Sequence, residues 1–258
     1  MENSFIHDFH IHASGYRTGD SKKMTIDNSM IVEVIVRKAE RFGLKSICII
    51  EHLEPVSGRH PWEEPLKVKR EVEKIRKNTH LTVLSGCEAS IIDIDGNLSA
   101  PDKEIIDAGF DIVIASFHKM PYEVKNIDEF HDLALEMMIA AGKKEFVRIL
   151  GHPWRDTPKI LKKVLPGFSW NFNLIPEKHI KEIAEISLEN NVCLEISMPA
   201  VESSPEYSDF IRKLNKYGSI FSIGSDAHDL ARMRDAVTIS KILSDLEINH
   251  NKLMEFKK

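Results

Sequence analysis

Histidines and carboxylates stand at the ends of the apolar segments that the sequence predicts to be β-strands. Only 12 of the 258 residues are histidines, yet five of seven predicted strands end with at least one, and the other two end with a glutamate. Imidazole and carboxylate together suit zinc, iron or manganese, whereas calcium prefers oxygen ligands. The pattern therefore predicts a transition-metal site. The strand-end motifs are Asp8-Phe9-His10-Ile11-His12, Glu51-His52, Gly86-Cys87-Glu88, Phe117-His118, Gly151-His152-Pro153, Glu195-Ile196-Ser197 and Gly224-Ser225-Asp226-Ala227-His228.

The spacing of the first motif favours joint ligation of one ion. His10 and His12 are two residues apart, so on a strand both side chains leave the same face. A single histidine at a strand end, such as His52 or His118, is more often a hydrogen-bonded core residue than a ligand. Six imidazoles and several carboxylates at one place are different, because without an ion the carboxylates would repel one another and the imidazoles would lack partners.

The segments that carry these motifs alternate with amphipathic stretches, which is typical of βα units around a parallel sheet. Strands are predicted over residues 5–12, 46–52, 82–88, 111–118, 147–152, 192–197 and 220–226. Helices are predicted over residues 30–42, 65–77, 101–108, 129–141, 177–190, 206–216 and 230–243. In an α/β barrel the carboxyl ends of the strands converge on one mouth. We therefore expect one α/β domain over residues 1–258, a TIM-like barrel one strand short of the usual eight.

Composition narrows the function classes. A net charge of −5 offers no basic surface for nucleic acid, and 42% hydrophobic residues suffice for a large core. No apolar run reaches the length of a membrane span, and the first residues lack the features of a signal peptide, so we expect a cytoplasmic protein without membrane contact. The three cysteines, Cys48, Cys87 and Cys193, are predicted to be core residues rather than disulfides or zinc ligands.

The remaining histidines are predicted to have no role at the metal site. His7 points to the opposite strand face from Asp8 and is interpreted as structural. The others lie in predicted loops or helices, where we expect them to be solvated; they are His60, His80, His131, His179 and His250.

Two connecting segments leave alternatives open. Residues 90–99 contain the turn signal Asp95-Gly96 and form either a hairpin or an extended loop. Residues 154–176 are aromatic and long for a loop, so they form either a lid over a substrate or a packed rim around the mouth. Arg155 in this segment either binds a phosphate or forms an ion pair with Asp156 or another neighbour.

The motifs DFHIH, EH, GCE, FH, GHP and GSDAH, in this order over residues 8–228, resemble those of the PHP superfamily of polymerase and histidinol phosphatase domains. The resemblance is strongest to the stand-alone histidinol-phosphatase-like branch, which implies a role such as that in histidine biosynthesis. It implies a distorted seven-stranded (β/α)7 barrel that holds two to three divalent ions, commonly zinc, manganese or iron.

Matched residue by residue, the resemblance implies three metal sites. Two departures are visible: the loop after the first motif has no histidine where many relatives place a ligand, with Asp20 as a substitute, and Glu51 stands where aspartate is common. The implied sites are His10, His12, Glu88 and Asp226; Glu88, His118 and His152; and His52 with His228.

These ligands predict a metal-dependent phosphatase. Ions bound at such a centre can clamp a phosphate and activate water to hydroxide at neutral pH, and no GxSxG elbow for a serine nucleophile is present. Two divalent ions outweigh the charges of Glu88 and Asp226, so the centre stays positive and suits a small phosphomonoester, with a histidinol-phosphate-like compound as leading candidate. Glu88, Asp226, His228 and Arg155 are the predicted catalytic residues.

Three other functions remain open at this point. An amidohydrolase-type enzyme also uses a barrel with a His-x-His motif, but we expect it to have fewer histidines on the second and fourth strands. A non-catalytic metal-binding module would not need so complete a ligand set. A phosphodiesterase or nuclease would need a basic track along which the polymer could bind, and the sequence shows none.

Overall fold

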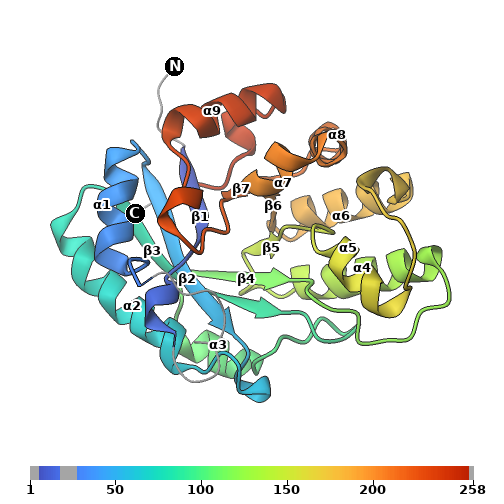
Figure 1. Cartoon of the computed structure of the whole chain (residues 1–258), viewed down its shortest axis with the longest axis horizontal. Coiled ribbons are helices and arrows are strands. Elements are labelled where there is room, and N and C mark those ends of the chain that lie inside the picture. Colours follow the sequence, from blue (N-terminus) through green and yellow to red (C-terminus); the bar gives the residue numbers. More distant parts are fainter. Residues whose placement is uncertain (1–5, 18–27, 256–258) are drawn as a thin grey trace.

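The seven predicted strands form one parallel sheet. The computed structural model describes residues 6–17 and 28–255. Within them the strands pair in chain order, each with the next, so every connection runs to the neighbouring strand (Figure 1). All seven strand predictions are confirmed for the described residues, with shifts of a few residues at the ends. The strands are β1 (His7–His12), β2 (Ser46–Leu53), β3 (Thr82–Ser90), β4 (Ile112–Ser116), β5 (Ile149–Gly151), β6 (Cys193–Ser197) and β7 (Phe221–Gly224).

The sheet curves until its first and last strands meet. Just past the end of β7, the carbonyl oxygen of Ala227 accepts a hydrogen bond from the backbone N–H of His12 at 3.0 Å, and Ile11 and Ala227 form an isolated parallel bridge. Along the described residues β1 and β7 share no longer ladder, so the barrel is nearly closed. The prediction of seven parallel strands in a barrel-like α/β arrangement is confirmed.

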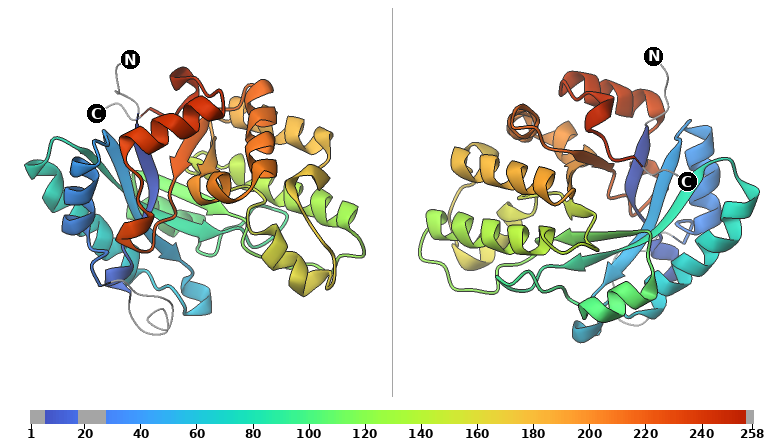
Figure 2. Two further views of the ribbon diagram at one scale, coloured as in Figure 1. Left: turned by 45° about the horizontal axis from the view of Figure 1, so that its top comes forward. Right: turned by 180° about the vertical axis from the view of Figure 1, so that it is seen from behind.

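Helices lie along the outside of the curved sheet between successive strands (Figures 1 and 2). Each predicted helix has a counterpart, and two short helices, α5 and α7, were not predicted. The last helix begins later than expected, because Asp235 caps it by accepting a hydrogen bond from the Thr238 N–H at 2.8 Å. The helices are α1 (Val32–Arg41), α2 (Glu63–Ile75), α3 (Asp102–Ala108), α4 (Ile127–Gly142), α5 (Thr157–Val164), α6 (Glu177–Glu189), α7 (Met198–Ser203), α8 (Pro205–Lys216) and α9 (Ala236–Asp245).

The core has two parts. A large apolar layer fills the space between the sheet and the helices, and a smaller cluster that includes Phe9, Ile50 and Ile114 forms a separate core from the opposite strand faces. The cysteine prediction is confirmed, since all three cysteines are buried and free. Among the described residues no helix is both long and apolar enough to cross a membrane.

The structure bears on the two connecting segments for which the sequence left alternatives. Residues 91 and 98 form an antiparallel bridge, and Gly96 takes the left-handed conformation with φ of +71°, so residues 90–99 form a hairpin. In residues 154–176, Trp154 and Phe172 are buried and contact the ring of Phe210 in α8 at centroid distances of 5.9 and 5.6 Å. These two residues pack as expected for a rim around the mouth, whereas Phe168 in the same segment is 41% exposed.

Candidate metal centre

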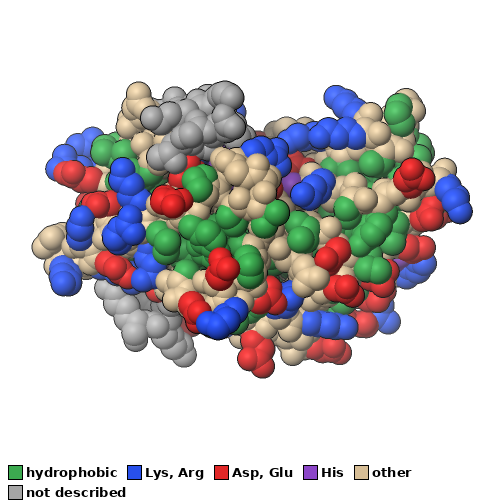
Figure 3. All heavy atoms as spheres, turned by 90° about the horizontal axis from the view of Figure 1, so that it is seen from below, with side chains coloured by type: hydrophobic (Ala, Val, Ile, Leu, Met, Phe, Trp, Pro, Cys, Tyr) green, Lys and Arg blue, Asp and Glu red, His purple; other side chains and the backbone are tan. Residues whose placement is uncertain are grey.

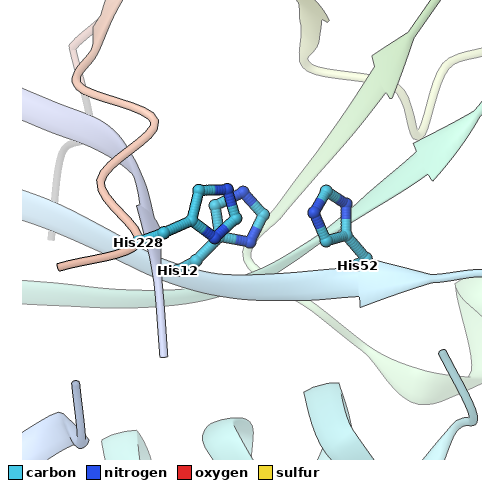
Figure 4. A group of neighbouring side chains, drawn as sticks. All are labelled: His12, His52 and His228. Atoms are coloured by element: carbon cyan, nitrogen blue, oxygen red, sulfur yellow. The ribbon is translucent and has the colours of Figure 1, made fainter. Parts of the chain in front are cut away.

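The structure brings all eight predicted ligands together at the carboxyl ends of the strands. They come from six strands or the residues that directly follow them, and Figure 4 shows three of them, His12, His52 and His228, side by side. The eight are His10, His12, His52, Glu88, His118, His152, Asp226 and His228.

Glu88 lies at the centre of the cluster. Its Oε1 is 3.2 Å from His118 Nε2 and 3.1 Å from His152 Nε2. Its Oε2 lies on the other side, 3.6 Å from His10 Nε2, 3.5 Å from His12 Nε2 and 2.8 Å from His52 Nδ1. A carboxylate whose two oxygens face separate groups of imidazoles is positioned to bridge two ions.

Asp226 faces the same group from β7. Its Oδ1 is 3.2 Å from His12 Nε2, 3.5 Å from His10 Nε2 and 3.3 Å from His228 Nε2. Asp226 has a φ of 47° and His152 a φ of 32°, a left-handed backbone that costs energy for residues other than glycine. Such strain at two strand ends aims their side chains into the cluster.

The spacing of the donor atoms fits transition-metal ions. Zinc–nitrogen bonds of about 2.0–2.1 Å in a tetrahedral shell separate neighbouring ligand atoms by roughly 3.3 Å. The separations of 3.1 Å between His10 Nε2 and His12 Nε2, and of 3.1 and 3.2 Å from Glu88 to His152 and His118, are close to this value. Among the eight predicted ligands, three groups have ligand atoms within 4.8 Å of one another: His10, His12 and Glu88; Glu88, His118 and His152; and His12, His52 and His228. Two further groups in the described residues meet the same limit: His10, His152 and Glu195; and Glu51, His60 and Glu64.

The electrostatics of the cluster keep its carboxylates ionised. Burial raises the pKa of Glu88, but the charges of His118, His10 and His52 outweigh burial and hold the pKa of Glu88 well below its ordinary value. Burial likewise opposes ionisation of Asp226, whose pKa is held well below the ordinary value by Arg155 and by hydrogen bonds with His12 and His228. Anionic oxygens are therefore available to metal ions at neutral pH.

Glu195, the glutamate of the strand-end motif of β6, orients two of the histidines. Its Oε1 is 2.8 Å from His10 Nδ1, and its Oε2 accepts the backbone N–H of His152 at 2.8 Å. Because an ionised carboxylate only accepts hydrogen bonds, the Nδ1 of His10 is the donor and its Nε2 faces the cluster. Gly224 makes room for this contact, since a Cβ there would overlap Glu195 Oε1.

Arg17 is a further residue of the site that the sequence analysis did not identify. It follows the short helix η1 (Ser14–Tyr16) and is 3% exposed. Its Nε donates to Glu51 Oε2 at 3.0 Å, and its Nη2 lies 3.0 Å from His228 Nδ1. Asp20, the predicted substitute ligand in this loop, lies outside the described residues. The only signal in the sequence was the position of Arg17 in the loop where another ligand was expected.

The contact with Arg17 determines the hydrogen bonding of His228. A guanidinium has no acceptor, so the Nδ1 of His228 must accept, and the proton of the neutral ring then lies on Nε2. Burial lowers the pKa of His228, and the charges of His12 and Arg17 act in the same direction, which favours the neutral ring. In this arrangement His228 donates its Nε2–H towards Asp226 Oδ1 at 3.3 Å and has no free nitrogen lone pair for an ion.

Arg155 forms ion pairs with neighbouring carboxylates, which is the second of the two contacts predicted for it. Its Nη1 donates to Asp226 Oδ2 at 2.7 Å, and its Nε is 3.6 Å from Asp156 Oδ1. It also lines a cavity of about 390 Å³ at the mouth, together with Glu88, Asp226 and four of the histidines. The guanidinium has five N–H donors, so further donors remain for a ligand in that cavity.

The prediction that the other histidines are solvated is wrong for three of them. His60 is 4% exposed and packs against the ring of His52 at 4.8 Å. His131 in α4 and His179 in α6 are 0% and 2% exposed, because the faces of these helices that carry them pack against each other. The prediction holds for His80, which is exposed. His7 is structural as predicted, since its Nε2 accepts the Ile223 N–H at 3.1 Å.

Known proteins resemble the chain in fold and in sequence. No family model matches the chain. A protein from Burkholderia multivorans, N-isopropylammelide isopropylaminohydrolase, has a similar fold with a TM-score of 0.53 at 13% identity, covering 95% of this chain and 69% of that one. At this identity the likeness concerns the fold alone.

Several relatives are named probable phosphatases. One from Vibrio parahaemolyticus is 25% identical over 255 residues, covering 94% of this chain and 86% of the relative. One from Thermoanaerobacter sp. (strain X514) is 32% identical over 235 residues, covering 86% of this chain and 85% of the relative. With this identity over nearly the full length of both proteins, the chain belongs to the same family as these probable phosphatases.

Proposed function

We propose that the chain is a metal-dependent phosphomonoesterase of the PHP type that hydrolyses a small phosphate ester at a dinuclear centre. The observation that carries the proposal is the position of Glu88, whose two oxygens face separate groups of imidazoles at 2.8–3.6 Å. The family relationship to probable phosphatases supports the same reaction type.

Two groups of residues would hold the ions. The first ion would be held by His10, His12 and Glu88, together with Asp226. The second ion would be held by Glu88, His118 and His152. In each of these two groups of three residues the donor atoms lie within 4.8 Å of one another. Zinc, manganese or iron bound there would polarise a phosphoryl oxygen and lower the pKa of bound water towards neutrality.

We assign no ion to the third group, His12, His52 and His228. The buried guanidinium of Arg17 already supplies a fixed positive charge beside this group, bonded to Glu51 and to His228. Because the proton of neutral His228 lies on Nε2, this nitrogen would have to lose it before binding an ion. Its N–H instead faces Asp226 Oδ1, 3.3 Å from Nε2, which accepts it.

Arg155 would bind the phosphate. In this structure it neutralises the outer oxygen of Asp226, Oδ2, while Oδ1 faces the histidines. A guanidinium matches a phosphate in charge and in planar geometry, so its remaining donors can hold two phosphate oxygens. Arg155 thus connects the substrate to a ligand of the first ion.

The experiment is a substrate panel with protein purified without chelators. Metal content is measured by elemental analysis, and turnover is measured with p-nitrophenyl phosphate, histidinol phosphate, a mononucleotide, single-stranded DNA and a set of amides, with zinc and with manganese. We expect two ions per chain and turnover of the phosphomonoesters. Turnover of amides alone would favour an amidohydrolase, and preference for single-stranded DNA would favour a nuclease. Full metal occupancy without any turnover would indicate a non-catalytic module.

A further inference from the structure

Three lysines without carboxylate partners line the mouth of the candidate site. Lys119 follows His118 directly, and Lys159 and Lys163 come from α5. The two arginines of the same lining are paired, Arg59 with Glu54 and Arg155 with Asp226, both at 2.7 Å. Within the part of the chain that the structure describes, none of the three lysines has a carboxylate oxygen within 4.0 Å.

The three lysines lie around the same part of the mouth. They line the cavity of about 390 Å³ at the mouth and also a small side pocket of about 80 Å³, and His118 lines both. Lys159 and Lys163 are one helical turn apart, so they lie on the same side of α5. Figure 3 shows Lys and Arg side chains close to the place where a histidine reaches the surface.

Helix stability alone does not account for this arrangement: Lys163 in the last turn of α5 is favourable for the helix dipole, but its spacing from Lys159 is not favourable. Like charges four residues apart destabilise a helix by about 0.2–0.5 kcal/mol. Asp156 lies near enough for the charge of Lys159 to lower its pKa, but neither lysine forms an ion pair within 4.0 Å in the described part of the chain. Lys162 on the same helix lines neither cavity. The positive charge is thus directed to the mouth, where ions at the metal centre would add to it.

A single phosphate group cannot contact all of the positively charged side chains at the mouth. A phosphomonoester dianion held between the metal centre and Arg155 leaves the three ammonium groups around the side pocket without a directly bonded anion, although Asp156 and Glu54 of the same lining lie close enough to interact with Lys159 and Lys119. Electrostatic attraction in such a cleft favours a ligand with further negative charge. The cavity has a volume typical of a small-molecule site, so the positive charge at the mouth does not require a polymeric ligand.

We infer that Lys119, Lys159 and Lys163 form a second anion subsite, so that the substrate carries another phosphate or carboxylate group besides the phosphate that is hydrolysed. The inference rests on the proposed phosphatase function for the role of the metal centre. It adds a substrate class, namely small phosphate esters with a second anionic group.

The test compares the binding of three non-hydrolysable phosphonates to the zinc-loaded protein by calorimetry. Propylphosphonate has one anionic group, whereas 3-phosphonopropionate adds a carboxylate and propane-1,3-bisphosphonate adds a second phosphonate. We expect at least one of the two longer anions to bind about tenfold tighter or more than propylphosphonate, and their order distinguishes a carboxylate from a phosphate subsite. Equal affinities of all three would overturn the inference.

Two variants separate the subsite from general surface charge. In the triple variant Lys119→Gln, Lys159→Gln and Lys163→Gln, the ratio of affinities should fall to about one. In the matched control Lys162→Gln the ratio should stay as in the wild type. A ratio that persists in the triple variant, or tighter lysine-dependent binding of a single-stranded oligonucleotide than of any small anion, would contradict the inference. Absence of ester turnover would refute the proposed function but leave this binding ratio measurable.

Discussion

Replacing Arg17 by methionine tests the assignment of this residue as a built-in cation. The change keeps most of the apolar stem and removes the charge, which leaves Glu51 buried opposite an uncharged side chain. The side chains of Arg17 and Glu51 are 1% and 0% exposed, and their closest atoms are 3.0 Å apart. Removing one partner of a buried ion pair costs about 3–5 kcal/mol, because the other charge remains desolvated.

The assay is urea unfolding of chelator-treated protein. We expect Arg17→Met to lower the free energy of unfolding by about 3–5 kcal/mol, and the double variant Arg17→Met, Glu51→Gln to recover a large part of the loss. The matched control is Arg37→Met on α1, whose ion pair with Glu33 has side chains 69% and 60% exposed. Such a surface pair contributes about 0–1 kcal/mol, so the control should change little.

Metal content gives a second measurement on the same proteins. The wild type should hold two ions per chain, and Arg17→Met should hold a third when zinc is supplied, since Glu51 and His228 then lose their cationic partner. Three ions in the wild type, or a loss of stability no larger than that of Arg37→Met, would refute the assignment of Arg17.

Three further changes have distinct expected outcomes. Glu88→Gln removes the bridging charge and should lower metal content and reduce phosphoester turnover by several orders of magnitude, whereas the exposed His80→Ala should do neither; equal effects would contradict the assignment. Arg155→Ala should lower kcat/KM for a phosphomonoester by roughly 10- to 100-fold, the range for a hydrogen bond to a charged group, and an unchanged kcat/KM would exclude contact with the phosphate. Burial, followed by the charge of His179, lowers the pKa of His131 from 6.5 to about 4. The unfolded chain therefore binds the extra proton first, so stability should fall by about 3 kcal/mol as the pH falls from about 6.5 towards 4. His131→Phe should flatten this dependence in urea unfolding, and an unchanged slope would show that His131 is not its source.

The strand ends explain why most of the site could be predicted from the sequence. Short apolar runs with a histidine or carboxylate at the end mark both a strand and its carboxyl terminus, and a parallel barrel brings those ends together. The missed helices are short: α5 has eight residues with Pro158 in its first turn, and α7 has six. At that length the apolar period that identifies a helix is barely sampled.

The contacts that the sequence did not predict depend on tertiary packing. Nothing local shows that Arg17, in a loop, turns back to Glu51 and His228, or that Glu195 points to His10 rather than to an ion. His131 was misjudged because α4 buries several apolar residues around it, and which face of a helix meets another helix is set by the fold. These contacts link residues far apart in sequence, from 34 positions for Arg17 and Glu51 to 211 for Arg17 and His228.

A metal titration of stripped protein tests the central claim most directly. The purified chain is freed of metal with a chelator, and turnover of p-nitrophenyl phosphate is followed while zinc or manganese is added back in known amounts. The dinuclear account predicts no turnover in the stripped protein and a rise in turnover that ends at two ions per chain. Turnover by the stripped protein, or no phosphoester turnover once two ions are bound, would contradict it.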